Sequence, residues 1–171
     1  MNLIGGRTAS LVNVFDSGAN GDGADALTIS GTEYNDVFLL RSATADNGLA
    51  FVALINGPTP LTPQAGDPVE RVNYNQNLEA MVVNGANGDD QFYVDDTRAS
   101  ITLNGDAGSD FFQIGQLYKS RRTPALAGIA PEDVFATIDT TVGWLSNGTS
   151  APMVINGGIG DDNFIVFHNL D

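Results

Sequence analysis

Gly85-Ala-Asn-Gly-Asp-Asp90-Gln-Phe92 and, twenty residues later, Gly105-Asp-Ala-Gly-Ser-Asp110-Phe-Phe112 are two copies of one pattern. Each copy starts as a polar turn of Gly and Asx residues, closes with an Asp, and places a Phe two positions beyond that Asp. Two more copies align with these without a gap: Gly31-Thr-Glu-Tyr-Asn-Asp36-Val-Phe38 and Gly157-Gly-Ile-Gly-Asp-Asp162-Asn-Phe164. Because so short a repeat cannot bury its own apolar face, we expect the copies to stack on one another.

The copy that begins at Gly157 resembles, at every specified position, the calcium-binding nonapeptide of RTX (haemolysin-type) proteins, GGxGxDxUx with U apolar. The two central copies depart from it at the second position, where they carry Ala86 and Asp106. The first copy has Thr32 and Tyr34 in place of Gly. A fifth and weaker copy, Asn20-Gly-Asp-Gly-Ala-Asp25-Ala-Leu27, lacks the first Gly.

The spacing of the two central copies predicts the fold. Twenty residues at the rise of a β-strand, with two corners, make one coil of a narrow right-handed parallel β-helix or β-roll. Within that coil we expect strands at residues 91–94 and 101–103, with a corner at 95–98. Asp25 and Asp36 are about half a coil apart, so their turns should lie on opposite sides. The prediction is therefore an all-β, single RTX-like module over residues 1–171, with about five irregular coils.

Two longer intervals, 54 residues from Gly31 to Gly85 and 52 residues from Gly105 to Gly157, indicate insertions at about 41–72 and 115–152. Each interval could hold two irregular coils, or one coil and an excursion. In the first, apolar runs at 37–40 and 49–55 flank Asn47-Gly48, which is typical of a hairpin. In the second, 134–138 and 141–144 look like strands.

Composition limits the class of protein. The chain has 171 residues, 42% of them hydrophobic, so it can build a core, and its net charge of −14 argues against binding to nucleic acid or anionic membranes. Of the 21 acidic residues, 17 are Asp, which favours turns and calcium sites over helical surfaces. The absence of Cys excludes disulfides and Cys-ligated zinc. No segment is long enough to span a membrane. The composition suits an extracellular or cell-surface bacterial protein, and equally an acidic cytosolic domain.

The Asp that closes each turn is the best candidate calcium ligand. Calcium takes six to eight oxygen ligands, and two stacked turns could complete one shell with carboxylates and backbone carbonyls. We expect Asp90 to share a site with Asp110, and Asp162 to share one with the turn that stacks on it. The alternative is that each Asp only caps its own turn through hydrogen bonds. The full predicted set of metal-site residues is Asp25, Asp36, Asp89, Asp90, Asp110, Asp161, Asp162, Gly85, Gly88, Gly105, Gly108, Gly157 and Gly160.

Other side chains have structural interpretations beside functional ones. Phe38, Phe92, Phe112 and Phe164 predict an internal aromatic ladder, with ligand binding as the alternative. His168 is the only histidine, and no motif places a nucleophile near it. Lys119, Arg121 and Arg122 form one basic island, interpreted as a solvated loop or as a contact with an acidic repeat or an anionic glycan.

The resemblance implies a calcium-binding structural module, not an enzyme, in a secreted or surface-anchored bacterial protein such as an adhesin or matrix protein. Its partners would be calcium and neighbouring repeats of the same polypeptide, with a glycan or surface ligand possible. Because the sequence stops at His168–Asp171, just past a strand-like run, we expect the chain to be part of a longer polypeptide. Calcium outside the cell would supply folding free energy that is missing in a low-calcium cytosol. A β-helix enzyme acting on polysaccharides and a glycan-binding module are the alternatives.

Overall fold

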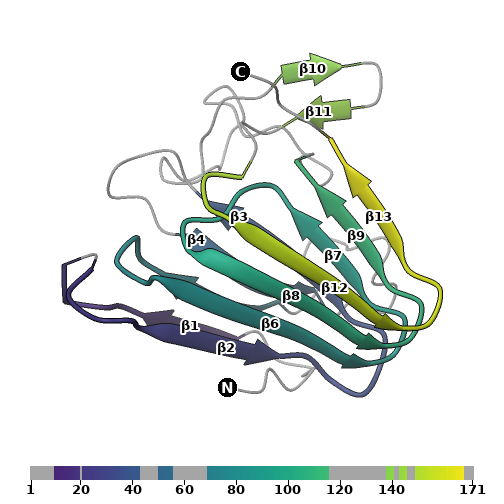
Figure 1. Cartoon of the computed structure of the whole chain (residues 1–171), viewed down its shortest axis with the longest axis horizontal. Coiled ribbons are helices and arrows are strands. Elements are labelled where there is room, and N and C mark those ends of the chain that lie inside the picture. The colour runs from purple at the N-terminus through teal and green to yellow at the C-terminus, as the bar shows by residue number, and fades with distance from the viewer. Residues whose placement is uncertain are drawn as a thin grey trace.

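The computed structural model describes residues 10–19, 21–42, 50–55, 69–115, 138–140, 143–145 and 149–167. Their strands form two large sheets and one short hairpin (Figure 1). No helix in these ranges is long and apolar enough to cross a membrane. His168 and the basic island at Lys119, Arg121 and Arg122 lie outside the described residues.

The smaller sheet has four strands, in the order β12-β8-β6-β2. These strands are β2 (Ala26–Ser30), β6 (Ala80–Asn87), β8 (Ser100–Ala107) and β12 (Met153–Ile159). Every pair in this sheet is parallel.

The larger sheet has seven strands, in the order β1-β5-β4-β3-β7-β9-β13. They are β1 (Ser10–Val14), β3 (Val37–Ser42), β4 (Ala50–Ile55), β5 (Val69–Tyr74), β7 (Gln91–Val94), β9 (Phe111–Ile114) and β13 (Asn163–Val166). The short hairpin pairs β10 (Ile138–Thr140) with β11 (Gly143–Leu145). Of the two strand segments expected near there, 134–138 lies outside the described residues except for Ile138, and 141–144 overlaps β11 only at residues 143 and 144.

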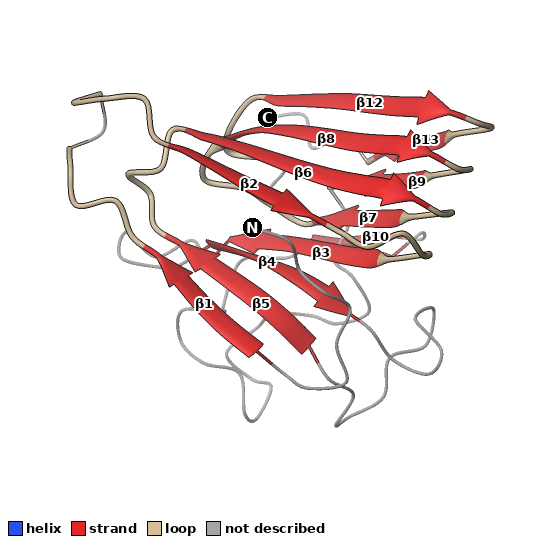
Figure 2. Cartoon of the chain, turned by 90° about the horizontal axis from the view of Figure 1, so that it is seen from below, coloured by secondary structure: helices blue, strands red, loops and turns tan. Residues whose placement is uncertain are grey.

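Each copy of the sequence pattern is the turn of a strand–turn–strand unit that crosses from the smaller sheet to the larger one. The four units are β2–β3, β6–β7, β8–β9 and β12–β13, and their turns lie one above another along one side (Figure 2). The parallel register aligns the copies residue by residue, with Phe38, Phe92, Phe112 and Phe164 as successive partners. The gap-free alignment of the sequence is therefore also the alignment in space.

The expected aromatic ladder is confirmed, and it forms one side of the core between the sheets. Neighbouring rings stack nearly parallel, with centroids 4.8, 4.8 and 5.1 Å apart along the series. Phe92 and Phe112 are fully buried, while Phe164, at the end of the series, is 49% exposed. The alternating burial of β6 and β7 shows the period of two that places one set of side chains inside.

The prediction of a right-handed parallel β-helix or β-roll of about five coils is wrong. The larger sheet is mixed, because β4 pairs antiparallel with both β3 and β5, and β1 then pairs parallel with β5. The hairpin expected around Asn47-Gly48 is present as the antiparallel pair β3–β4, and it takes the edge of β3 that a further parallel coil would need. Only four units stack in the described ranges, since the weak copy around Asp25 lies in the connection from β1 of the larger sheet to β2 of the smaller one, on the side opposite the four turns (Figure 2).

Candidate functional site

The closing Asp residues form a column of hydrogen bonds across the four turns. The backbone N–H of Asp36 donates to Oδ1 of Asp90 at 2.8 Å, that of Asp90 to Asp110 at 2.8 Å, and that of Asp110 to Asp162 at 3.0 Å. Each carboxylate thus binds the amide of the preceding unit. The predicted alternative to calcium was capping within one turn, whereas the carboxylates of Asp90, Asp110 and Asp162 cap the neighbouring turn.

Glycine opens each turn because the carboxylate of the closing Asp packs against its α-carbon. A Cβ added to Gly31 would lie 2.6 Å from Oδ2 of Asp36, and Cβ atoms on Gly85, Gly105 and Gly157 would overlap the closing Asp of the same turn. A Cβ on Gly85 would also lie 2.7 Å from the carbonyl oxygen of Gly105. The first position of the pattern is therefore fixed by lack of space.

The second and fourth positions are fixed by backbone conformation. Gly88, Gly108 and Gly160 have φ values of 114°, 146° and 138°, and Gly158 has 110°. The two departures at the second position, Ala86 and Asp106, also have positive φ, 85° and 72°. Side chains other than glycine seldom adopt this region, so the two central copies keep the turn of the full motif at some cost in strain, whereas Thr32 and Tyr34 of the first copy do not have positive φ.

The first turn satisfies its Asp internally. The backbone N–H of Thr32 donates to Oδ2 of Asp36 at 2.6 Å, and the Thr32 hydroxyl lies 3.0 Å from the same oxygen. Burial raises the pKa of Asp36, and these two hydrogen bonds oppose that rise. Thr32, one of the two residues that break the RTX pattern in this copy, thus supplies the donors for Oδ2 of Asp36.

The second and third turns leave a carboxylate oxygen without a donor. Asp90 and Asp110 are 0% and 1% exposed, and Oδ2 of each receives no hydrogen bond from the described residues. Burial, opposed by the bond from Asp36 and reinforced by the charges of Asp36, Asp110 and Asp89, raises the pKa of Asp90 to about 8. The pKa of Asp110 is raised as well, mainly by burial. An oxygen in this state requires either a proton or a cation.

The donor chemistry of this column fits calcium. It consists of hard oxygen atoms alone: the free carboxylate oxygens of Asp90 and Asp110, with glycine carbonyls of the stacked turns beside them. The predicted pair is brought together, and Asp162 continues the same column as the partner of Asp110.

Asp89 and Asp161 lie in a second, exposed column at the fifth position of the turns. The N–H of Asp89 donates to the Asn35 side chain at 2.9 Å, and the N–H of Ser109 donates to Asp89 at 2.9 Å. The N–H of Asp161 in turn lies 3.4 Å from the Ser109 hydroxyl. These two carboxylates face solvent, where water competes for them, so they are weaker metal candidates than the buried column.

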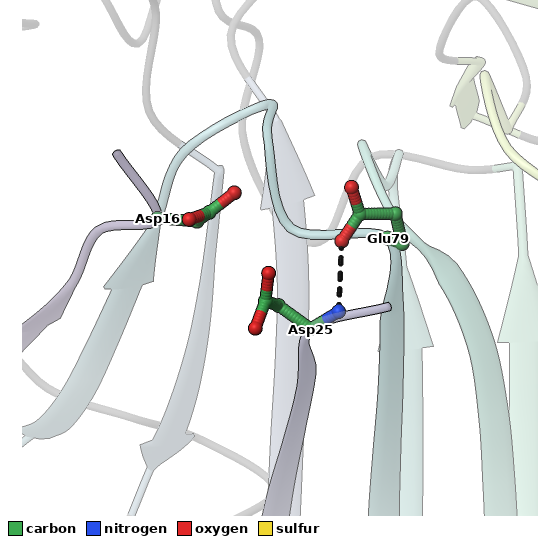
Figure 3. A group of neighbouring side chains, drawn as sticks. All are labelled: Asp16, Asp25 and Glu79. Atoms are coloured by element: carbon green, nitrogen blue, oxygen red, sulfur yellow. Dashed lines mark hydrogen bonds between the residues drawn. The ribbon is translucent and has the colours of Figure 1, made fainter. Parts of the chain in front are cut away.

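Asp25 belongs to a different acidic group, at the other end of β2. Its carboxylate, with those of Asp16 and Glu79, offers oxygens that all lie within 4.8 Å of one another (Figure 3). Glu79 accepts the N–H groups of Asp25 and Gly21, and these bonds lower its pKa. The three residues are exposed or half-buried, and hydrogen bonds account for the Glu79 carboxylate, while Oδ2 of Asp16 is buried without a donor among the described residues.

Sequence reasoning missed Asp16 and Glu79. The signal for Glu79 was present, because it follows Asp25 by the same 54 residues that separate Asp36 from Asp90. Asp16 is placed by the long-range contact of its backbone with Asn75, which no sequence spacing indicates.

Comparison with protein-family models, with curated proteins and with solved structures found no match.

Proposed function

We propose that the chain is a calcium-binding structural module, in which calcium stabilises the stack of Gly/Asp turns. One observation carries the proposal: the second and third turns bury carboxylates, those of Asp90 and Asp110, whose Oδ2 atoms have no donor among the described residues. Two neighbouring buried carboxylates repel one another, and a divalent cation bound between them would remove the repulsion.

Asp90, Asp110 and the glycine carbonyls of their turns would hold the ion. When bound, calcium would neutralise the carboxylates and link successive units. The protein holds both oxygens of each carboxylate in place. A backbone N–H of the neighbouring turn binds Oδ1, and Oδ2 packs beside Gly85 or Gly105, where a Cβ atom would leave no room for it. The turns are thus ordered for binding, which reduces the entropy lost when the ion enters.

In keeping with the RTX resemblance, we propose that the module belongs to a secreted or surface-anchored bacterial protein of adhesin or matrix type. The charge of −14 supports this setting, because self-repulsion would loosen the chain where calcium is scarce and calcium would compact it outside the cell. Neighbouring repeats of the same polypeptide would be its partners.

The test is thermal unfolding of the whole chain followed by circular dichroism. EDTA should lower the Tm by at least several degrees, and added calcium should restore it, because a ligand that binds only the folded state stabilises that state. Magnesium should restore it poorly, since it gives up its water shell reluctantly. Identical melting curves in EDTA and in millimolar calcium would overturn the proposal. The Thr32 turn offers a control: Thr32→Val should lower stability equally with and without calcium.

A further inference from the structure

The two ends of the stack differ. At the β2–β3 end, β4 covers the edge of β3, and Thr32 satisfies the carboxylate of Asp36 within the first turn. At the opposite end, β12 and β13 are the outermost strands of their sheets (Figures 1 and 2). β2 is the outermost strand of the smaller sheet at the first end, but its core-facing Leu27 and Ile29 are 9% and 0% exposed, so the core is closed there. The opposite end is therefore the one to consider for a partner.

Core-facing side chains are exposed at the β12–β13 end. Phe164 is 49% and Val166 64% exposed, whereas their register partners in the next unit, Phe112 and Ile114, are 0% and 7% exposed. A cavity of about 530 Å³ opens there between the sheets. Its apolar lining includes Ile114, which belongs to the core, Met153 and Ile155, which pack against the core, and the exposed Val166. The end is therefore an open cross-section of the core and not a finished surface.

Within the part of the chain that the structure describes, three hydrogen-bond columns also stop at this end, each with a defined polarity. In the asparagine column, Asn156 donates its amide to Asn104 at 2.8 Å, as Asn104 does to Asn84, which leaves Oδ1 of Asn156 as the next acceptor. In the Asp column, each N–H donates to the carboxylate of the following unit, and within the described residues the N–H of Asp162 has no such acceptor.

The third column runs in the opposite sense. The side chain at the fifth turn position accepts the N–H of the next unit, as Asp89 does from Ser109, so the carboxylate of Asp161 is the next acceptor. The end thus presents two acceptors and one donor around an exposed aromatic ring. A segment that matches all of them needs Asn before the opening Gly, Asp at the close of the turn, and Phe two residues later.

We infer that the β12–β13 end is a docking site for a further strand–turn–strand segment with this Asn-Gly…Asp-x-Phe pattern, added in parallel register. A second copy of the chain fits less well, because two identical open ends facing one another would bring acceptor columns against acceptor columns and pair the strands antiparallel. The inference deepens the proposed function by naming which end takes a neighbouring repeat and by what chemistry, and it rests on the stacking role of the module.

A labelled peptide with the sequence of residues 100–115 is the probe, titrated against the whole chain with fluorescence anisotropy in EDTA and in calcium. Binding should be saturable, and a peptide with the changes Asp110→Ala and Phe112→Ser should bind at least tenfold more weakly. In the protein, Val166→Asp should weaken binding at least tenfold, because it places a carboxylate on the core-facing side. Val154→Asp is the matched control: Val154 is similarly exposed, at 56%, but alternates with the core-packed Met153 and Ile155 on β12, and its change should leave binding intact.

A covalent version removes the entropic cost of capturing a free peptide. Residues 95–99 connect β7 to β8, and residues 167–171 provide a connection of the same length, so residues 100–115 are appended directly after Asp171. The added unit should raise the Tm by at least about 3 °C relative to an appended unit with the two changes, and should slow hydrogen exchange at the Asp162 amide.

The outcomes separate the two proposals. Docking that is equal in EDTA and calcium, with no effect of either on the Tm, would overturn the calcium site and leave the docking site standing. Calcium stabilisation without peptide binding and without a gain from the appended unit would overturn the docking site alone. Concentration-dependent dimers that Val166→Asp abolishes, in sedimentation of the chain by itself, would assign this end to a second copy and refute the inference.

Discussion

Replacing Phe92 with Ala tests whether the stack of turns is held by the aromatic ladder. The Phe92 ring is fully buried between Phe38 and Phe112, with both centroids 4.8 Å away and interplanar angles of 12° and 8°. Its removal leaves a cavity with aromatic walls on both sides, where the strands are fixed by their parallel ladders and cannot collapse. We expect a loss of about 3–5 kcal/mol in the free energy of unfolding, which is a large share of the ~5–15 kcal/mol typical of a domain.

Phe164→Ala is the matched comparison, because it removes the same group from the same position of another unit. Phe164 has one stacked neighbour, at 5.1 Å, and is 49% exposed. About half of its surface is therefore already in water, and little cavity can form at an open end. We expect a loss of about 1–2 kcal/mol.

Urea unfolding followed by circular dichroism, in calcium and again in EDTA, gives both values from the midpoint and slope of each transition. Should Phe92→Ala fail to fold, Phe92→Leu provides a smaller loss on the same scale. Equal losses at positions 92 and 164 would refute the reasoning, since they would mean that burial and two-sided stacking do not set the energetics of the ladder. Phe111 alternates with the buried Phe112 on β9 and is only partly buried. If Phe111→Ser lowered the free energy of unfolding as much as Phe112→Ser, the assignment of Phe112 to the core-facing side of β9 would be refuted.

Three further predictions concern the turns. In calcium, Asp90→Ala and Asp110→Ala should each remove the shared site, so the double variant should cost little more than either single one. Fully additive losses in calcium would mean that the two residues serve separate sites or only cap turns; a thermodynamic cycle of urea midpoints measures the coupling. Ala86→Gly should raise stability by about 1 kcal/mol, because it relieves a backbone with φ of 85°, whereas Ala107→Gly in the next turn should lower stability; the reverse order would contradict the account of the second position. In EDTA, stability should fall as pH rises from about 4 to about 8. The pKa of Asp90 is raised from an ordinary 3.8 to about 8, so in this window the folded chain holds a proton that the unfolded chain has released. The pH dependence of the Tm should flatten in Asp90→Asn, and a rise of Tm with pH would count against a buried protonated Asp.

Local regularity in the sequence predicted much of the stack. The shared Gly…Asp-x-Phe pattern predicted that the turns of Asp90 and Asp110 are neighbours, the strand at 91–94, and the burial of the Phe side chains, because side chains alternate along strands in register. It left open which turns stack across the two long intervals. The hairpin between β3 and β4 was also predictable, from apolar runs around Asn47-Gly48.

The prediction of a regular parallel β-helix failed because the edge of a sheet can be completed in more than one way. The unpaired edge of β3 can accept a parallel strand from another coil or an antiparallel strand from a hairpin, and both satisfy its backbone groups. β4 follows β3 closely in the chain, so it reaches that edge at little entropic cost, and β5 and β1 extend the sheet from there.

For the candidate site, the sequence by itself identified the residues of the turns, because the Gly and Asp positions follow from backbone conformation and space that recur in each copy. Only the tertiary structure decided what each carboxylate does. Asp36 is satisfied by Thr32 within its own turn, Asp90 and Asp110 keep a buried oxygen without a donor, and Asp25 joins Asp16 and Glu79 at the far end of β2. These roles depend on burial and on partners from other units, and the same Gly-Asp turn acquires a different environment according to what stacks on it.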